Sequence, residues 1–130
     1  PKETEFRLPE EPGKANWRFR TDLCKEITFM DINIGVQKFK LGEDFSDFII
    51  WRKDGYPSYE LATVVDEISM CITEIVRGLD LLKSSARQNL IFSALGETSP
   101  AFYHCEIMTD AKGRKLSKSD RTLPRLSLPF

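Results

Sequence analysis

The fold of this chain is decided by the stretch Ile72-Thr73-Glu74-Ile75-Val76-Arg77-Gly78-Leu79-Asp80-Leu81-Leu82. Its apolar run, Ile72 to Val76, predicts a buried β-strand, and Arg77 follows at the carboxyl end of that strand. A helix is then expected from about Ser84 to Leu95, and a further strand from Pro100 to Ile107. A strand, a helix and a second strand in this order are typical of a doubly wound α/β sheet.

Both ends of this predicted helix carry local signals. Ser84 or Ser85 can cap its start, and Gly96 can end it, because glycine adopts the left-handed conformation readily. Its expected inner face consists of the apolar residues Ala86, Leu90, Ile91, Ala94 and Leu95.

An earlier helix is predicted by an apolar stripe with the spacing i, i+3, i+4 and i+7. Ser58 can cap this helix, and Glu60 lies in its first turn, where the helix dipole favours a negative charge. Residues 1–55 are predicted to form a β-rich connective segment that ends in the turn Lys53-Asp54-Gly55. The stripe consists of Leu61, Val64, Val65 and Ile68, and the strand candidates are Trp17–Arg20, Ile27–Met30, Val36–Phe39 and Asp47–Arg52.

The composition bounds the class of protein. The chain has 130 residues, of which 41% are hydrophobic and 30% charged, and its formal net charge is -1. This balance argues against a general nucleic-acid binder but leaves room for a local basic patch. No apolar stretch approaches the roughly 20 residues that span a bilayer, so a cytoplasmic protein is expected. The three cysteines, Cys24, Cys71 and Cys105, are too far apart to predict a zinc site or a disulfide framework.

Arg77 is the first candidate for chemistry. A guanidinium at the carboxyl end of a strand lies where α/β sheets bind ligands, and it can hold a carboxylate through two hydrogen bonds. The alternative interpretation is a structural ion pair with Asp80 or Glu74. Tyr59 and Thr63 are four residues apart and share a helix face, where they serve either a small polar ligand or ordinary packing.

The second candidate is the loop Lys115-Leu116-Ser117-Lys118-Ser119, in the most basic part of the chain. Its lysines can reach a triphosphate and offset the charge that grows on a leaving pyrophosphate. A solvated basic loop is the alternative interpretation.

Read together, these segments resemble a family. Residues 47–55, 59–67 and 72–82, followed by Ala86-Arg87-Gln88, His104 and the lysine loop, are similar to the catalytic domain of class I glutamyl-tRNA synthetases and of the glutamyl-queuosine tRNA(Asp) synthetases. The resemblance implies an α/β fold, with residues 56–130 as the C-terminal half of a Rossmann-like nucleotide-binding domain. It also implies that ATP, with Mg²⁺, activates glutamate, which is then transferred to a tRNA or to queuosine in tRNA(Asp).

The resemblance assigns roles to individual residues. Tyr59 and Arg77 match residues that hold the glutamate substrate. Thr63 matches a third such position, which is usually asparagine in the glutamyl-tRNA synthetases. This difference, and Leu79 at a position often acidic, favour the queuosine-modifying relatives.

The nucleotide residues form a second group. Asp80 matches an acidic residue near the ATP, and His104 matches a histidine near the nucleotide, with a hydrogen-bonded structural histidine as the alternative. The loop residues Lys115, Ser117 and Lys118 match the mobile ATP loop, and the two lysines match its catalytic lysines.

The chain also departs from the family pattern. It has one histidine, so the His-Ile-Gly-His signature of the family cannot be present. A truncated synthetase that is inactive alone is therefore expected, with a separate N-terminal half or a second copy as partner. The alternative is a non-catalytic module that binds tRNA, a nucleotide or a partner protein. Neither zinc nor a membrane is expected.

Overall fold

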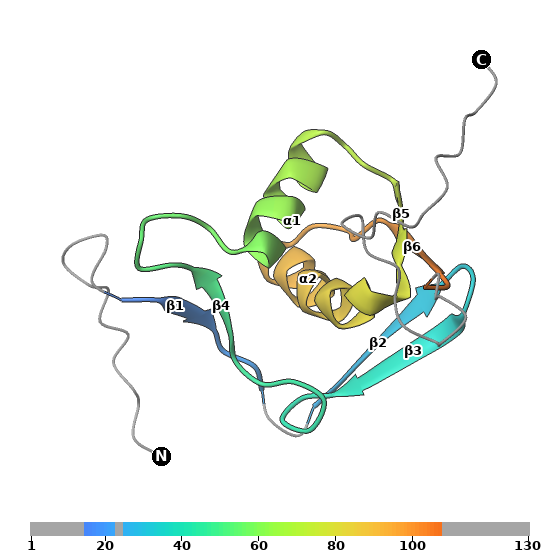
Figure 1. The fold of residues 1–130 in the computed structure, drawn as a ribbon, viewed down its shortest axis with the longest axis horizontal. Helices are drawn as coiled ribbons and strands as arrows, with labels where there is room; N and C mark the ends of the chain where they lie inside the picture. Colours follow the sequence, from blue (N-terminus) through green and yellow to red (C-terminus); the bar gives the residue numbers. More distant parts are fainter. Residues whose placement is uncertain (1–14, 23–24, 108–130) are drawn as a thin grey trace, which may run out of the picture.

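The computed structural model describes residues 15–22 and 25–107 of the chain. Its strands form two sheets, which Figure 1 shows on either side of a central helix. The smaller sheet is an antiparallel pair of β1 (Trp17–Phe19) and β4 (Phe48–Trp51). The larger sheet has the order β3-β2-β6-β5, with β2 (Glu26–Asp31), β3 (Gly35–Lys40), β5 (Glu74–Gly78) and β6 (Ala101–Cys105).

Two helices lie between and beside the sheets. The central helix is α2 (Leu82–Leu95), which follows a short 3-10 turn, η1 (Leu79–Leu81), and packs against α1 (Tyr59–Ser69). Ser58 caps α1 as predicted, because its hydroxyl accepts a hydrogen bond of 3.3 Å from the amide of Leu61. Neither of these helices is long and apolar enough to cross a membrane.

The predicted order of strand, helix and strand is confirmed by β5, α2 and β6. The two strands are parallel neighbours, with Ile75 opposite Phe102 and Arg77 opposite His104. β2 also pairs in parallel with β6, and it turns back into β3 through the hairpin that begins at Asp31. The sheet therefore combines parallel strands with one antiparallel edge strand, β3.

The predicted cap of α2 is wrong. The helix begins at Leu82, directly after η1, and within residues 15–22 and 25–107 no side chain caps it. Ser85 lies inside the helix instead, where its hydroxyl hydrogen-bonds the carbonyl of Leu81. The predicted end is confirmed, since Gly96 adopts the left-handed conformation with φ of 74°.

The predicted inner face of α2 is wrong in part. Ala86 and Ile91 are buried as expected, but Ala94 and Leu95 are exposed on the last turn. The buried side includes two polar residues, Ser85 and Gln88, which an apolar pattern does not count. Phe92 completes this face, because positions 85, 88 and 92 are three and four residues apart.

The prediction of a buried strand over Ile72–Val76 also needs correction. The strand runs from Glu74 to Gly78 at the edge of the sheet, and the side chain of Val76 is 69% exposed. Alternation along the strand turns Ile75 and Arg77 towards the helices and Val76 away from them. The run Ile72–Val76 therefore combines a loop with half of an edge strand.

The core lies between the helices and the two sheets. Val64 of α1 is fully buried, while Val65, predicted on the same stripe, is exposed. Phenylalanine rings dominate the core and contact one another in a chain from β4 to β6. Its buried members are Phe39, Leu41, Phe45, Phe48, Val64, Ala86, Ile91 and Phe92.

Candidate functional site

Polar side chains gather at the carboxyl ends of the three parallel strands. Asp31 ends β2, His104 is the last but one residue of β6, and Arg77 is the last but one residue of β5. Strand alternation turns all three side chains towards the helices, on the same side of the sheet as its buried apolar residues. Together with partners from α1 and α2 they form a group that we call the polar row, which consists of Asp31, His104, Ser85, Arg77, Gln88 and Glu67.

One end of the polar row is a buried pair of Asp31 and His104. Oδ2 of Asp31 lies 2.5 Å from Nδ1 of His104, and both side chains are 0% exposed. Burial alone would raise the pKa of Asp31, but hydrogen bonds from His104 and from the amides of Ile34 and Asn33 outweigh it and lower the pKa. The carboxylate is therefore ionised at neutral pH and fixes the orientation of the imidazole ring.

Arg77 occupies the other end of the row. Its Nη1 donates to Oε1 of Gln88 at 2.6 Å and to the hydroxyl of Ser85 at 3.3 Å. Its Nη2 donates to Oε1 of Glu67 at 3.1 Å, and its guanidinium lies over the ring of Phe102, 5.2 Å from the centroid. The side chains of Arg77 and Glu67 are only 7% and 9% exposed. This arrangement holds the guanidinium plane from one face and two edges.

Glu67 is the less satisfied partner of this ion pair. Burial raises its pKa, and the positive charge of Arg77 only partly opposes that effect. Its Oε2 is buried without a hydrogen-bond partner in the described part of the chain, as is Nε2 of Gln88. The ion-pair interpretation of Arg77 therefore applies in this structure, but with Glu67 in place of Asp80 or Glu74.

Sequence reasoning missed Glu67, although a signal for it existed. Glu67 follows the buried Val64 by three residues, so the two share the inner face of α1. A search for apolar periodicity does not register polar residues on an inner helix face. Ser85 and Gln88 on α2 were missed for this reason, as Glu67 was.

The other predicted site residues are placed differently. Tyr59 begins α1 and is 53% exposed, eight residues before Glu67, which is about 12 Å along a helix axis. Thr63 lies one turn after Tyr59 and is partly buried. The polar row thus meets α1 near its end, whereas Tyr59 lies at its start.

Asp80 lies in η1, with its carboxylate folded back over Gly78. A Cβ atom added to Gly78 would come within 2.5 Å of Oδ1 of Asp80, so glycine leaves room for that carboxylate. Lys115, Ser117 and Lys118 lie outside the described residues. Within residues 15–22 and 25–107, no three histidine, cysteine, aspartate or glutamate side chains converge as metal ligands.

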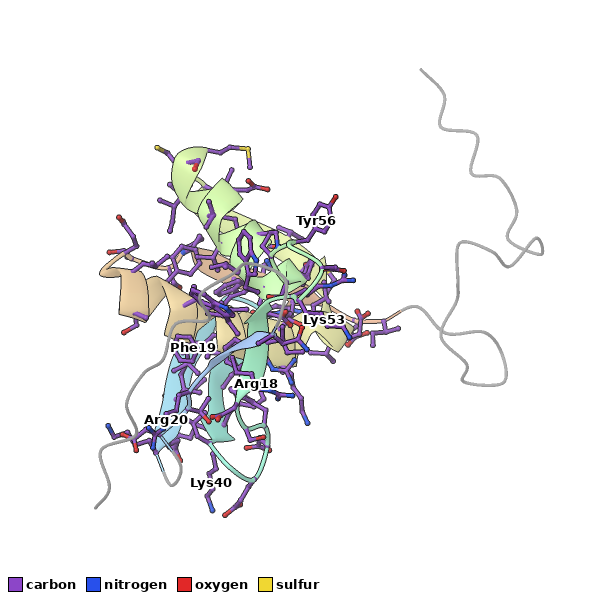
Figure 2. All side chains as sticks on the ribbon, turned by 90° about the vertical axis from the view of Figure 1, so that its left-hand side faces the viewer. Arg18, Phe19, Arg20, Lys40, Lys53 and Tyr56 are labelled. Atoms are coloured by element: carbon purple, nitrogen blue, oxygen red, sulfur yellow. The ribbon has the colours of Figure 1, made fainter. Side chains whose placement is uncertain are left out.

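A second candidate surface lies on the opposite side of the helices, on β1, β4 and the adjoining loops. We call it the β1–β4 face. Figure 2 shows this face towards the viewer, with Tyr56, Lys53, Arg18 and Arg20 labelled on it. A hollow of about 800 Å³ on this face is lined by Arg18, Arg20, Thr21, Asp22, Ser46 and Asp47.

Aromatic residues accompany the basic ones on the β1–β4 face. Trp17 and Trp51 are cross-strand neighbours, and both are partly exposed, as is Tyr56 to a larger degree. Asp47 is tied down by the amide and hydroxyl of Thr21, and the hydrogen bond from that amide lowers its pKa. A surface that carries both exposed cations and exposed aromatic rings is suited to phosphates and stacked bases.

The parallel strands β5 and β6, joined through α2, define an α/β domain with a polar row at the carboxyl ends of its strands, and comparison with known proteins specifies its class. The family model described as "tRNA synthetases class I (E and Q), catalytic domain" matches residues 2–126. The chain belongs to this family. The predicted resemblance and the predicted α/β fold of a class I synthetase catalytic domain are thereby confirmed.

Individual relatives agree with this assignment. A glutamyl-Q tRNA(Asp) synthetase of Chromobacterium violaceum is 43% identical over 106 residues, which are 82% of this chain and 35% of the relative. A glutamate--tRNA ligase of Metamycoplasma arthritidis is 34% identical over 93% of this chain and 26% of the relative. The crystal structure of a glutamate-tRNA synthetase from Elizabethkingia anophelis is 32% identical with a TM-score of 0.71, over 78% of this chain and 20% of that chain. The chain thus spans about a third or less of the length of these relatives.

Proposed function

We propose that this chain supplies the amino-acid-binding and ATP-loop part of a ligase that activates glutamate with ATP and transfers it to a tRNA. The observation that carries the proposal is Arg77, a permanent positive charge held at the carboxyl edge of the sheet by Ser85, Gln88 and Phe102. The carboxylate of Glu67 already accepts a hydrogen bond from Nη2 of Arg77. The side-chain carboxylate of a glutamate substrate would share this guanidinium or take the place of Glu67.

Tyr59 and Thr63 are proposed as further glutamate contacts. The acyl group of the glutamate would then lie near the start of α1. Lys115, Ser117 and Lys118 would bind the triphosphate, and the family match over residues 2–126 includes them. The two lysines would act by neutralising charge on the leaving pyrophosphate, which is a positioning and electrostatic role without a protein nucleophile.

Asp80 is proposed to lie near the ATP, since it follows the carboxyl end of β5 directly. For His104 the geometry favours the structural alternative, because both of its ring nitrogens are engaged by Asp31 and Ser85. Mg²⁺ would arrive on the phosphates of ATP, where it neutralises charge and links phosphate oxygens.

The acceptor is proposed to be an RNA that contacts the β1–β4 face. Its basic groups, such as Arg18 and Arg20, can meet phosphates, and its aromatic rings can stack on bases. Thr63 and Leu79 favour queuosine in tRNA(Asp) over the 3′ end of tRNA(Glu) as the acceptor. Such a reaction would take place in the cytoplasm.

The side of the larger sheet that faces away from the helices carries exposed apolar residues, which support a protein partner. Met30 lies opposite Val36, and Val76 lies opposite Tyr103, and all four point away from the helices with exposed side chains. We propose that this side packs against a separate amino-terminal half, with a second copy of the chain as the other occupant. Exposed apolar patches of this kind promote association.

Val76→Lys tests this surface. A lysine at this exposed position of β5 should weaken the association of the chain with its partner at least tenfold. Val65→Lys, at an exposed position of α1, should not weaken it. Light scattering measures the mass with and without an amino-terminal half from the Chromobacterium violaceum relative. A mass of one chain under all conditions would contradict the proposal.

Glutamate-dependent exchange of labelled pyrophosphate into ATP tests the function. The 130 residues alone should give little or no exchange, because their single histidine precludes the His-Ile-Gly-His signature. Adding the amino-terminal half should produce exchange. Clear exchange by these residues alone would overturn the expected inactivity. If no exchange is seen after the amino-terminal half is added, the proposed ligase function is contradicted.

A non-catalytic RNA-binding module is the second candidate, and the β1–β4 face favours it. That candidate predicts salt-dependent RNA binding by the chain with no exchange under any combination. Filter binding of a tRNA transcript at several salt concentrations, run beside the exchange assay, separates the two candidates.

A further inference from the structure

Three contacts connect Asp31 to Arg77 through the interior of the protein. Oδ2 of Asp31 lies 2.5 Å from Nδ1 of His104, and Nε2 of His104 lies 2.9 Å from the hydroxyl of Ser85. That hydroxyl in turn accepts from Nη1 of Arg77 at 3.3 Å. Asp31, His104 and Ser85 are all at most 1% exposed. The three links join three parallel strands and α2, so no single element holds them together.

We propose that Asp31, His104 and Ser85 are positioning residues, which fix the guanidinium of Arg77 for a substrate carboxylate. The inference rests on the proposed function, because it names what holds the group that would bind glutamate. Burying polar groups costs free energy unless each is hydrogen-bonded, and apolar side chains would fill this space at lower cost. This chain of hydrogen bonds ends on Arg77. A requirement that the Arg77 guanidinium keep a fixed position explains why the polar residues are retained.

The direction of the hydrogen bonds supports this role. Because the carboxylate of Asp31 can only accept, Nδ1 of His104 must carry the proton between them. Arginine can only donate, so the hydroxyl of Ser85 must present a lone pair to Arg77. This holds whether Nε2 of His104 donates to that hydroxyl or accepts from it. Asp31 therefore orients the ring, and the ring and the carbonyl of Leu81 together determine where the hydroxyl lone pair points.

The contacts from α2 and β6 hold one end and one face of the guanidinium. Ser85 and Gln88 both bond Nη1, and the ring of Phe102 lies against the guanidinium face. Nη2 is directed instead towards Glu67, whose second oxygen has no partner in the described part of the chain. The fixed end of the guanidinium is thus separate from the end that meets a carboxylate. Pre-set geometry of this kind lowers the entropy lost when a ligand binds.

The test uses the full chain and the variant Ser85→Ala, with Ser84→Ala as matched control. Alanine is a good helix former, and both serines lie in the first turn of α2, but only Ser85 belongs to the polar row. Nitrogen-15 NMR of the arginine side chains measures rotation of the Arg77 guanidinium. Rotation should become about tenfold faster in Ser85→Ala, since one hydrogen bond to a charged group is lost, and should not change in Ser84→Ala.

Asp31→Asn provides a second variant of nearly the same shape. It should remove the strongly downfield Nδ1 proton resonance of His104 and loosen Arg77, while Ser85→Ala keeps that resonance. A merely structural role would lower stability without changing guanidinium rotation in the folded protein. An Arg77 group that stays equally fixed in both variants would overturn the inference.

Exchange kinetics with the amino-terminal half added connect the inference to function. Ser85→Ala should raise the KM for glutamate about tenfold while the KM for ATP stays unchanged. If the wild-type chain supports no exchange, the proposed function fails, but the NMR result still decides whether the chain of hydrogen bonds positions Arg77. An unchanged KM for glutamate together with a loosened Arg77 would limit the role to structure and overturn the inference.

Discussion

The polar row and the β1–β4 face both contain arginine, but the charge is buried in the first and exposed in the second. In the polar row, Arg77 is buried over Phe102 and bonded to Glu67, Gln88 and Ser85. On the β1–β4 face, Arg18 and Arg20 line an open hollow. A buried guanidinium is fixed by its neighbours, and its removal leaves unpaired charge behind. An exposed guanidinium contributes little to stability and is available to a partner from outside.

The largest expected effect comes from Arg77→Met. It should lower the free energy of unfolding by about 3–5 kcal/mol at neutral pH, because it leaves Glu67 buried without its counter-ion. Urea unfolding measures the loss. Arg52→Met is the control, since Arg52 pairs with Asp54 at the surface, where an ion pair contributes less than about 1 kcal/mol. Equal losses in the two variants would remove the distinction between the two regions.

The same variant has a predicted pH dependence. The pKa of Glu67 is already raised by burial, and without Arg77 it should rise further. A group with a raised pKa favours the folded state while it is protonated and loses that contribution as the pH rises through its folded value. The deficit of Arg77→Met should therefore shrink as the pH falls towards the ordinary glutamate value of 4.5. A deficit that stays constant over this range would show that Glu67 is not the group left unpaired.

Asp31→Asn should have the next largest effect. The pKa of Asp31 is lowered in the folded protein, so its charge stabilises the fold at pH values above the ordinary pKa of 3.8. This contribution is lost as the pH falls below that value. The variant should lose about 1–3 kcal/mol at neutral pH, which is the cost of weakening a buried charged hydrogen bond. Thermal unfolding over a pH series measures both effects. Asp47→Asn, on the exposed face, is the control and should change stability less.

The smallest effect on stability is expected from the double variant Arg20→Ala and Lys53→Ala. Surface substitutions of this kind change the free energy of unfolding by about 0.5 kcal/mol or less. RNA binding should weaken, and the slope of log affinity against log salt should fall by roughly 0.7 for each single-strand phosphate that the variant no longer neutralises. Lys38→Ala, on β3, is the matched control. A large loss of stability with unchanged RNA binding would reverse the comparison.

The sequence predicted the order of the elements better than it predicted the polar row, for a physical reason. The order of β5, α2 and β6 and the left-handed end at Gly96 followed from local signals, namely apolar runs, turn residues and a glycine. The polar row joins residues that are distant in the chain, such as Asp31 and His104, which are 73 positions apart. Its helical members, Ser85, Gln88 and Glu67, interrupt the apolar pattern on which such predictions depend. Arg77 and His104 were identified as site candidates, but the partners that hold them could not be.

The most direct test of the account is glutamate-dependent pyrophosphate exchange by Arg77→Lys, combined with the amino-terminal half. Lysine keeps the positive charge opposite Glu67, so the fold should survive, but it cannot form the planar, two-bond contact with a carboxylate. The account predicts that kcat/KM for glutamate falls at least a hundredfold, while the wild-type combination shows clear exchange. A variant with the same kcat/KM as the wild type would contradict the claim that Arg77 binds the substrate carboxylate.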